Sequence, residues 1–228
     1  MTNATPRRVA AIIAAAGSGS RLGSDIPKAF VLLNGLSLLT RSALVMSAVS
    51  DVIVVAAPRD HLSLCADMLS EVDAEIHVVE GGASRQESVA LALQGIPEDV
   101  DVVLVHDAAR AVVPIEVCAR VINAVRDGNP AVIPVLPVVD TLNRVDPQGF
   151  VVDTVNRDNV RRVQTPQGFT REVLMQAHQD STHIATDDAG LLATLGIPVL
   201  TVLGHERGMK ITTPEDLVIA EHYVKDLA

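Results

Sequence analysis

Short apolar segments alternate with helix-like segments along most of the chain, and this alternation limits the fold more than any other feature. The segments expected to form strands are Val9–Ala15, Val52–Ala56, Glu75–Val79, Val100–Val105, Ala131–Val135 and Val199–Leu203. The helix-like segments lie near residues 37–49, 60–70, 84–94, 114–126, 170–179 and 187–195, and a last helix begins at Thr213. The alternation predicts an α/β fold, with a Rossmann-like, mostly parallel twisted sheet and helices on both of its faces.

One segment departs from this rhythm. Between residues 138 and 163, two strand-like runs flank the turn sequence Asp146-Pro-Gln-Gly149, which predicts an inserted β-hairpin. Such a hairpin is either an ornament at the sheet edge or an arm that reaches a partner subunit. The length of 228 residues suits one large domain. We therefore treat residues 1–228 as a single domain with a β-arm at about 138–163.

The composition excludes several classes of protein. The chain has a net charge of -10, and only 2% of its residues are aromatic. Nucleic-acid binding depends on positive charge and, for single strands, on aromatic stacking, so we expect no nucleic-acid partner. The two cysteines, Cys65 and Cys118, fit no metal-binding spacing and are expected to be free, buried thiols.

The N-terminal segment has two interpretations. Arg7 and Arg8 precede an apolar run over residues 9–16, as they would in a secretory leader. That run leads directly into a Gly-rich turn, however, which favours a first buried strand. No other apolar stretch approaches the roughly 20 residues that a membrane span needs. We expect a cytoplasmic protein with no membrane partner.

The first strand ends in Gly17-Ser-Gly-Ser-Arg-Leu-Gly23, and Lys28 follows shortly after. A Gly-rich turn at the carboxyl end of a strand lets backbone N–H groups approach a phosphate, and Arg21 and Lys28 add countercharge. The loop is neither a Walker A motif nor a dinucleotide fingerprint, because Leu22 stands where the latter needs a third glycine. The residues alone leave a plain strand-to-helix turn as the alternative.

A second group of polar residues follows the strand at 100–105. Asp107 is a lone carboxylate there; it is either an N-cap for the helix near 114 or a ligand for Mg²⁺ or another divalent cation. Magnesium takes one or two protein carboxylates and shares its remaining positions with water and substrate phosphates.

A third block, Gly81-Gly-Ala-Ser-Arg-Gln-Glu-Ser88, lies in the sequence between the glycine-rich loop and Asp107. It either reads the edge of a base or forms only a capped glycine turn.

Several motifs occur together in an order typical of one enzyme family. They are Ala14-Ala-Ala-Gly-Ser-Gly-Ser-Arg21, Pro27-Lys28, Gly81-Gly82 with Arg85 and Ser88, Val105-His-Asp-Ala-Ala-Arg110, Gln164-Thr-Pro-Gln167, Thr186-Asp187 and Lys210-Ile-Thr-Thr-Pro-Glu-Asp216. The chain, from about residue 9 to its end, resembles the 2-C-methyl-D-erythritol 4-phosphate cytidylyltransferases of the non-mevalonate isoprenoid pathway.

The resemblance implies a homodimeric transferase that moves CMP from CTP to 2-C-methyl-D-erythritol 4-phosphate and releases pyrophosphate. It implies that Asp107 holds Mg²⁺ and that the catalytic residues are Arg21, Lys28, Arg157 and Lys210. The residues that it assigns to substrate binding are Ala14, Ala15, Ala16, Gly17, Ser18, Gly19, Gly82, Ser88, Ala108, Arg110, Thr141, Thr165 and Thr186. In that family the hairpin is exchanged between subunits, so Thr141 and Arg157 would serve the site of the neighbouring subunit.

The chain departs from the usual family pattern in a few places. Ala29, Ala83 and Ala111 replace residues that many members carry, and Arg161-Arg162 fall where a bulky residue is frequent. None of these departures removes a charged catalytic position, although Arg161 and Arg162 are near enough to Arg157 to share its role.

The remaining polar residues have simpler interpretations. We expect His106 to be a hydrogen-bonded histidine of the core. Asp187 and Asp188 are expected to stabilise the N-terminus of the helix that they begin. No Ser/His/Asp or Cys/His set is evident, which fits a reaction whose nucleophile is a phosphate that is already largely ionised at neutral pH.

Three other functions stay open. A ribitol 5-phosphate cytidylyltransferase would share the nucleotide motifs and differ only in its acceptor pocket. An NAD-dependent dehydrogenase is disfavoured by the missing third glycine. A nucleotide-sensing dimer without catalysis is disfavoured by the intact Arg21, Lys28, Asp107 and Lys210.

Overall fold

A computed structural model describes residues 8–17, 26–180 and 185–225. Its central sheet has eight strands, in the order β10-β7-β11-β6-β1-β4-β5, with β12 on the other edge of β7. The strands are β1 (Arg8–Ala14), β4 (Val52–Ala57), β5 (Glu75–Glu80), β6 (Val100–Asp107), β7 (Ala131–Pro137), β10 (Arg161–Val163), β11 (Gln167–Thr170) and β12 (Leu200–Leu203). All pairings are parallel except those of β10 and β11, which confirms the predicted mostly parallel sheet.

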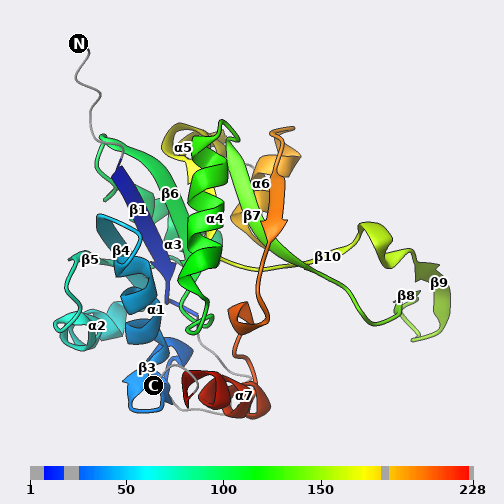
Figure 1. Ribbon diagram of the computed structural model, residues 1–228, viewed down its shortest axis with the longest axis horizontal. Coiled ribbons are helices and arrows are strands. Elements are labelled where there is room, and N and C mark those ends of the chain that lie inside the picture. The colour runs from blue at the N-terminus through cyan, green and yellow to red at the C-terminus, as the bar shows by residue number, and fades with distance from the viewer. Residues whose placement is uncertain (1–7, 18–25, 181–184, 226–228) are drawn as a thin grey trace.

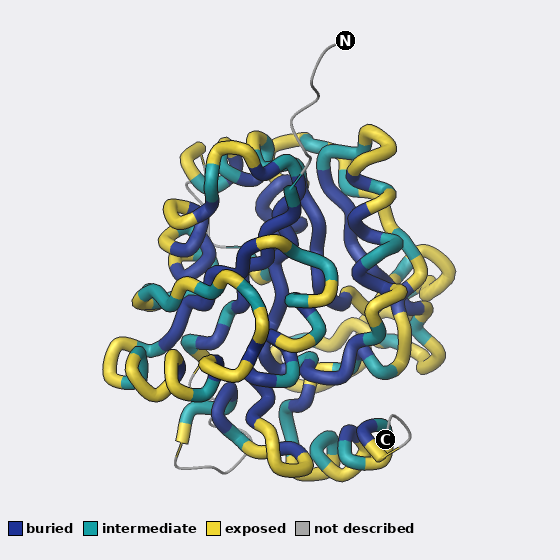
Figure 2. Tube along the Cα trace, turned by 60° about the vertical axis from the view of Figure 1, so that its left-hand side comes forward, coloured by how far each residue is buried: buried dark blue, intermediate teal, exposed yellow. Residues whose placement is uncertain are grey.

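Helices cover both faces of the sheet (Figure 1). One face carries α1 (Leu38–Ser47), α2 (Leu62–Leu69) and α4 (Ile115–Arg126), and the other carries α3 (Arg85–Leu93), α5 (Arg171–Asp180) and α6 (Asp188–Thr194). The side chains of β1 alternate between the two layers, as a pleated strand requires, and every residue from Val9 to Ile13 is buried. Figure 2 shows the buried strands at the centre of the molecule.

Smaller elements complete the fold. The short strands β2 (Leu32–Leu33) and β3 (Leu36–Ser37) pair with each other, and α7 (Pro214–Lys225) packs beside them. The 3-10 turns are Lys28–Phe30, Arg59–His61, Arg157–Asn159 and Glu206–Gly208. Cys65 and Cys118 are both free and buried, as predicted, and burial raises the pKa of each thiol to about 12. None of the helices in the described ranges has the length and apolarity needed to cross a bilayer.

The inserted hairpin predicted from the sequence is present. It consists of β8 (Leu142–Val145) and β9 (Val151–Val155), which pair with each other and with no strand of the central sheet. The carboxylate of Asp146 accepts hydrogen bonds from the backbone N–H groups of Gln148 and Phe150, at 3.0 and 2.8 Å, and so stabilises the turn. Figure 1 shows the hairpin projecting well away from the sheet.

The sequence did not predict β10 and β11. They run along one edge of β7 in the direction opposite to it, and β11 fills the space between β6 and β7. Only Phe169 in β11 is a large apolar side chain, so the segment lacks the apolar run that marked the other central strands. The two strands carry the chain from the hairpin back into the core.

Gly168 in β11 packs closely against α4. A Cβ atom on this residue would lie 2.4 Å from Cγ1 of Val121, closer than carbon atoms approach in proteins, and 3.2 Å from Cγ2 of Val125, which is also tight. Only glycine therefore allows this spacing between helix and strand.

We predict that Gly168→Ala destabilises the protein by about 1–3 kcal/mol, because the added methyl group would overlap the branched side chain of Val121. Urea unfolding measures the loss. The double variant Gly168→Ala/Val121→Ala should lose less than the sum of the two single variants, since the second change makes room for the first. Strict additivity of the two losses would contradict this account of the packing.

Candidate active site

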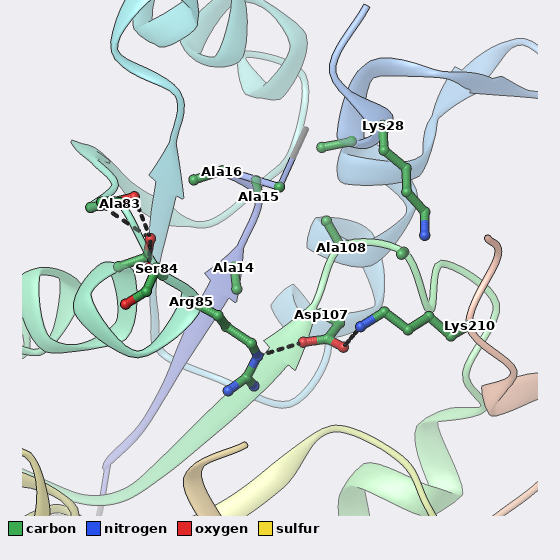
Figure 3. Close-up of a pocket in the computed structure, with 15 residues that line it drawn as sticks. Ala14, Ala15, Ala16, Lys28, Ala83, Ser84, Arg85, Asp107, Ala108 and Lys210 are labelled. Atoms are coloured by element: carbon green, nitrogen blue, oxygen red, sulfur yellow. Dashed lines mark hydrogen bonds and ion pairs between the residues drawn. The ribbon is translucent and has the colours of Figure 1, made fainter. Parts of the chain in front are cut away.

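A cavity of about 520 Å³ opens at the carboxyl ends of β1 and β6 (Figure 3). The loop between β5 and α3, the 3-10 turn at Lys28 and the segment before α7 close its other sides. Parallel strands bring their carboxyl ends to one edge of the sheet, which explains why motifs far apart in the sequence meet there. The predicted site residues that line this cavity are Ala14, Ala15, Ala16, Gly17, Lys28, Gly82, Ser88, Asp107, Ala108 and Lys210.

A smaller cavity of about 160 Å³ adjoins the first and shares Arg85, Asp107 and Lys210 with it. Three further predicted residues, Arg110, Thr165 and Thr186, line this second space. The structure therefore brings together thirteen of the predicted residues in two adjoining cavities.

The other predicted residues lie elsewhere. Ser18, Gly19 and Arg21 fall outside the described residues. Thr141 and Arg157 line neither cavity, because they belong to the arm; Thr141 directly precedes β8, and a guanidinium N–H of Arg157 donates to the carbonyl oxygen of Val139. In a single subunit, these two residues do not reach the site.

The loop from Gly81 to Ser88 is a capped glycine turn that also faces the larger cavity. The Ser84 hydroxyl accepts a hydrogen bond from Glu87 N–H at 3.0 Å, and the Glu87 carboxylate accepts one from Ala83 N–H at 2.8 Å. A Cβ atom on Gly82 would lie 2.2 Å from Cγ of Glu87, so glycine is needed for this close approach. The turn places Gly82 and Ser88 in the wall of the cavity, where Gly82 N–H donates to Oγ of Ser88 at 3.1 Å.

Asp107 is the centre of charge in the site. Its Oδ1 atom accepts a hydrogen bond from Nε of Arg85 at 3.0 Å, and its Oδ2 atom accepts one from Nζ of Lys210 at 2.8 Å. Nε of Arg110 lies 4.0 Å from Oδ2. Burial by itself raises the pKa of this carboxyl group, but the charges of Arg85 and Lys210 outweigh it and hold the pKa of Asp107 well below its usual range. Asp107 is therefore ionised at neutral pH.

The N-cap alternative for Asp107 is wrong. Helix α4 begins at Ile115, and the residue at its N-cap position is Pro114. The backbone N–H of Asp107 instead donates to Oγ1 of Thr165 at 3.1 Å, which ties the end of β6 to the chain that leads into β11.

His106 is a histidine of the core, as predicted. It is completely buried, and its Nδ1 atom is hydrogen-bonded to Oγ1 of Thr165 at 2.9 Å. Burial disfavours the charged imidazolium and lowers the pKa of His106 to about 4. The ring is therefore neutral at the pH at which the site would work.

Asp187 and Asp188 both lie at the N-terminus of α6, as the sequence predicted. Asp187 caps α6 by accepting a hydrogen bond from Gly190 N–H at 2.8 Å. Asp188 is in the first turn of α6, and its side chain is also turned into the core, where it pairs with Nη1 of Arg85 at 2.6 Å and with Nε2 of His178 at 3.0 Å. Arg85 belongs to a family motif but had no predicted role; its position after two glycines at a strand end was the available signal.

The residues at Asp107 fit a magnesium ion. Among the described residues no three His, Cys, Asp or Glu side chains gather as a metal-binding group. A single ionised carboxylate facing a cavity suffices for Mg²⁺, however, when substrate phosphates and water supply the other ligands. Oδ2 of this carboxylate already binds one cation, the ammonium group of Lys210, at 2.8 Å.

Comparison with known proteins identifies the family. Residues 9–226 match the model of the 2-C-methyl-D-erythritol 4-phosphate cytidylyltransferase family. The chain belongs to this family. Among curated relatives, the enzyme of that name from Frankia casuarinae is 49% identical over 94% of this chain and 80% of its own length. The one from Saccharopolyspora erythraea is also 49% identical, over 93% of this chain and 97% of its own length.

Solved structures of the family agree with this fold. The 4-diphosphocytidyl-2C-methyl-D-erythritol synthase of Anaerococcus prevotii superposes with a TM-score of 0.85 at 30% identity and covers 96% of both chains. The 2-C-methyl-D-erythritol 4-phosphate cytidylyltransferase of Thermus thermophilus gives a TM-score of 0.78 at 36% identity, over 96% of this chain and 99% of its own. The α/β architecture predicted from the sequence is thus that of the family.

We predict that His106 makes the protein less stable as the pH falls from 7 to 5. The unfolded chain binds a proton at this histidine with a pKa near 6.5, whereas the folded protein resists protonation until about pH 4. The unfolded state therefore takes up more protons in this window, and the free energy of unfolding should fall by about 2 kcal/mol.

Urea unfolding of the native protein and of His106→Gln at pH 7 and pH 5 tests this. The variant keeps a hydrogen-bonding side chain and removes the titrating group, so its stability should change less between the two pH values. An equal loss in both proteins would show that another group is responsible.

Proposed function

We propose that this protein transfers CMP from CTP to 2-C-methyl-D-erythritol 4-phosphate, in the non-mevalonate isoprenoid pathway. A phosphate oxygen of the acceptor attacks the α-phosphorus of CTP; the bond from that phosphorus to the bridging oxygen breaks, and pyrophosphate leaves. The new phosphoanhydride is that of 4-diphosphocytidyl-2-C-methyl-D-erythritol. The observation that carries the proposal is the meeting of Lys28, Lys210 and the ionised Asp107 at one cavity, in a chain of this family.

The chemistry needs charge and positioning rather than a general base. The acceptor phosphate has a second pKa of about 6 and is mostly dianionic at neutral pH. Two of the three lysines in the chain line the larger cavity together with Arg85, and Arg110 lines the adjoining one. Fixed cations of this kind stabilise the negative charge that builds up between two polyanions in the transition state.

The remaining residues fall into three roles. The backbone of Ala14 to Gly17, with Ser18, Gly19 and Arg21 beyond it, would wrap the triphosphate, and Gly82 and Ser88 would meet the cytosine. Arg110, Thr165 and Thr186 would contact the acceptor. Asp107 would hold Mg²⁺, which when bound neutralises phosphate charge and orients the nucleotide. A cytoplasmic location stays a prediction.

The arm is the feature from which we infer that the protein is a homodimer. It presents several apolar side chains to solvent, among them Val139 and Phe150, each 70% exposed, and Val151, 60% exposed. Apolar groups gathered on a projecting hairpin need a partner surface. A homodimer in which each arm crosses to the other subunit would cover them and bring Thr141 and Arg157 to the site of the neighbour.

Pyrophosphate release from CTP and Mg²⁺ tests the activity. We predict rapid release with 2-C-methyl-D-erythritol 4-phosphate and little with ribitol 5-phosphate. Lys28→Ala should lower kcat by about 100-fold or more, because a cation aimed at the transition state is lost. Lys225→Ala, at the exposed end of α7, is the matched control and should leave kcat unchanged. Release with ribitol 5-phosphate alone would overturn the acceptor assignment.

Mixing two inactive variants tests the exchange of arms. Arg157→Ala damages the arm and Lys28→Ala damages the body, so a mixed dimer would have one site with both defects and one intact site. Random pairing should restore about a quarter of the native activity. Lys28→Ala mixed with Lys210→Ala, both in the body, should restore none. A mixture of the first pair that stays inactive would contradict the exchanged-arm dimer.

A further inference from the structure

Arg85 lies between two buried carboxylates. Its Nε atom donates to Oδ1 of Asp107 at 3.0 Å, and its Nη1 atom donates to Oδ2 of Asp188 at 2.6 Å. The side chain of Arg85 is 25% exposed, that of Asp107 10% and that of Asp188 1%. Figure 3 shows the guanidinium reaching from the start of α3 to the carboxylate of Asp107, with Lys210 on its other side.

Asp188 is itself fixed on both sides. While Oδ2 accepts from Arg85, Oδ1 is hydrogen-bonded to Nε2 of His178 at 3.0 Å, and the side chain of His178 is only 5% exposed. Asp188 begins α6 and His178 lies near the end of α5, two helices that pack on the same face of the sheet. Arg85 is thus attached to the packed core and not only to the site.

The two oxygens of Asp107 differ in the mobility of their partners. Oδ1 is held by the guanidinium of Arg85, whose other end is fixed to Asp188. Oδ2 is hydrogen-bonded to Lys210, whose side chain is 43% exposed and whose charge is carried on a flexible four-carbon stem, while Nε of Arg110 lies further off, at 4.0 Å. Lys210 therefore has freedom to move toward a substrate phosphate, whereas Arg85 does not. Only Oδ2 becomes available to a metal ion when Lys210 moves.

Burying a row of charged groups such as Asp188, Arg85 and Asp107 costs free energy, so its presence calls for an explanation. Removing ions from water carries a penalty that an apolar replacement would avoid. Lys210 and Arg110 already place positive charge beside Asp107, so Arg85 is not needed for neutralisation alone. Its distinguishing property is that one planar group bridges two carboxylates at a fixed angle.

We propose that Arg85 is a positioning residue that fixes the Asp107 carboxylate with Oδ2 toward the cavity, and that Asp188, held by His178, fixes Arg85. The inference rests on the proposed function, because it takes Asp107 to be the ligand for the divalent cation that accompanies CTP. In the rival account, Arg85 supplies only countercharge. Arg85→Lys would then leave cation binding unchanged, and Arg85→Gln would strengthen it.

The test measures the dissociation constant of Mn²⁺ from the protein–CTP complex, with free Mn²⁺ followed by electron paramagnetic resonance. Arg85→Lys keeps the charge but loses the bridge, and should weaken Mn²⁺ binding by about 10-fold, as is typical when a partner of a metal ligand is lost. Asp188→Asn should weaken it in the same direction. Arg59→Lys, a matched change at an exposed ion pair with Glu80, should have no effect.

Coupling provides a second readout. If Asp188 acts only through Arg85, the double variant Arg85→Lys/Asp188→Asn should bind Mn²⁺ no more weakly than Arg85→Lys alone. Circular dichroism confirms folding, and if Arg85→Lys does not fold, the comparison is made with Asp188→Asn and Arg59→Lys. A purely structural role would lower the melting temperature without changing the dissociation constant, and would overturn the proposal.

Native Mn²⁺ affinity in Arg85→Lys with tighter binding in Arg85→Gln would also overturn it and establish the countercharge account. The positioning role of Arg85 and the proposed transfer reaction can be overturned independently of each other. If the native complex turns over CTP but Asp107→Asn leaves Mn²⁺ affinity unchanged, the positioning inference is overturned and the transfer reaction stands. If Mn²⁺ binding responds as expected but no CMP is transferred, the positioning holds and the proposed function fails.

Discussion

The carboxylate of Asp107 is the group around which the site is arranged. It stands at the end of a buried strand, where an ionised acid is stable only if cations surround it. Arg85, Arg110 and Lys210 supply those cations from three parts of the chain, and their ion pairs draw the helix α3, the loop after β6 and the segment before α7 toward one point. The cavity lies beside this point because each of these elements ends there.

This arrangement explains how an acidic protein provides a site for polyanions. The chain has a net charge of -10, yet the charged side chains that line the two cavities are mainly cationic. Charges at a cleft act over short distances, while those on the outer surface are screened by salt. The local potential at the site therefore depends on which few side chains the fold brings there and not on the total charge.

Much of the fold could be predicted from residue patterns. Strands β1, β4, β6 and β7 are mostly buried apolar runs, and β5 is a partly exposed edge strand with polar residues among its apolar ones. The sequence pattern located all five to within about two residues at either end. The hairpin was marked by its turn residues. Strands β10 and β11 escaped prediction because they depend on pairing with distant strands, β10 with β7 and β11 with both β6 and β7, which local periodicity does not record.

The site could be predicted only in part. The motifs selected Lys28, Asp107 and Lys210, since strand ends and glycine-rich turns are where an α/β sheet binds ligands. They did not reveal the pairing of Arg85 with Asp188, two residues 103 positions apart, because nothing local distinguishes an acid at a helix start that faces solvent from one that faces the core.

The sequence by itself determined the alternation of elements, the family motifs and the residue types available for phosphate chemistry, since all of these depend on short-range patterns of apolar, glycine and charged residues. Only the tertiary structure decided which of those charges meet. Burial at the end of β6 makes Asp107 depend on its cations, and the packing of α5 and α6 against the sheet fixes where Arg85 points. Ion pairs between distant segments arise from packing geometry, which no local pattern encodes.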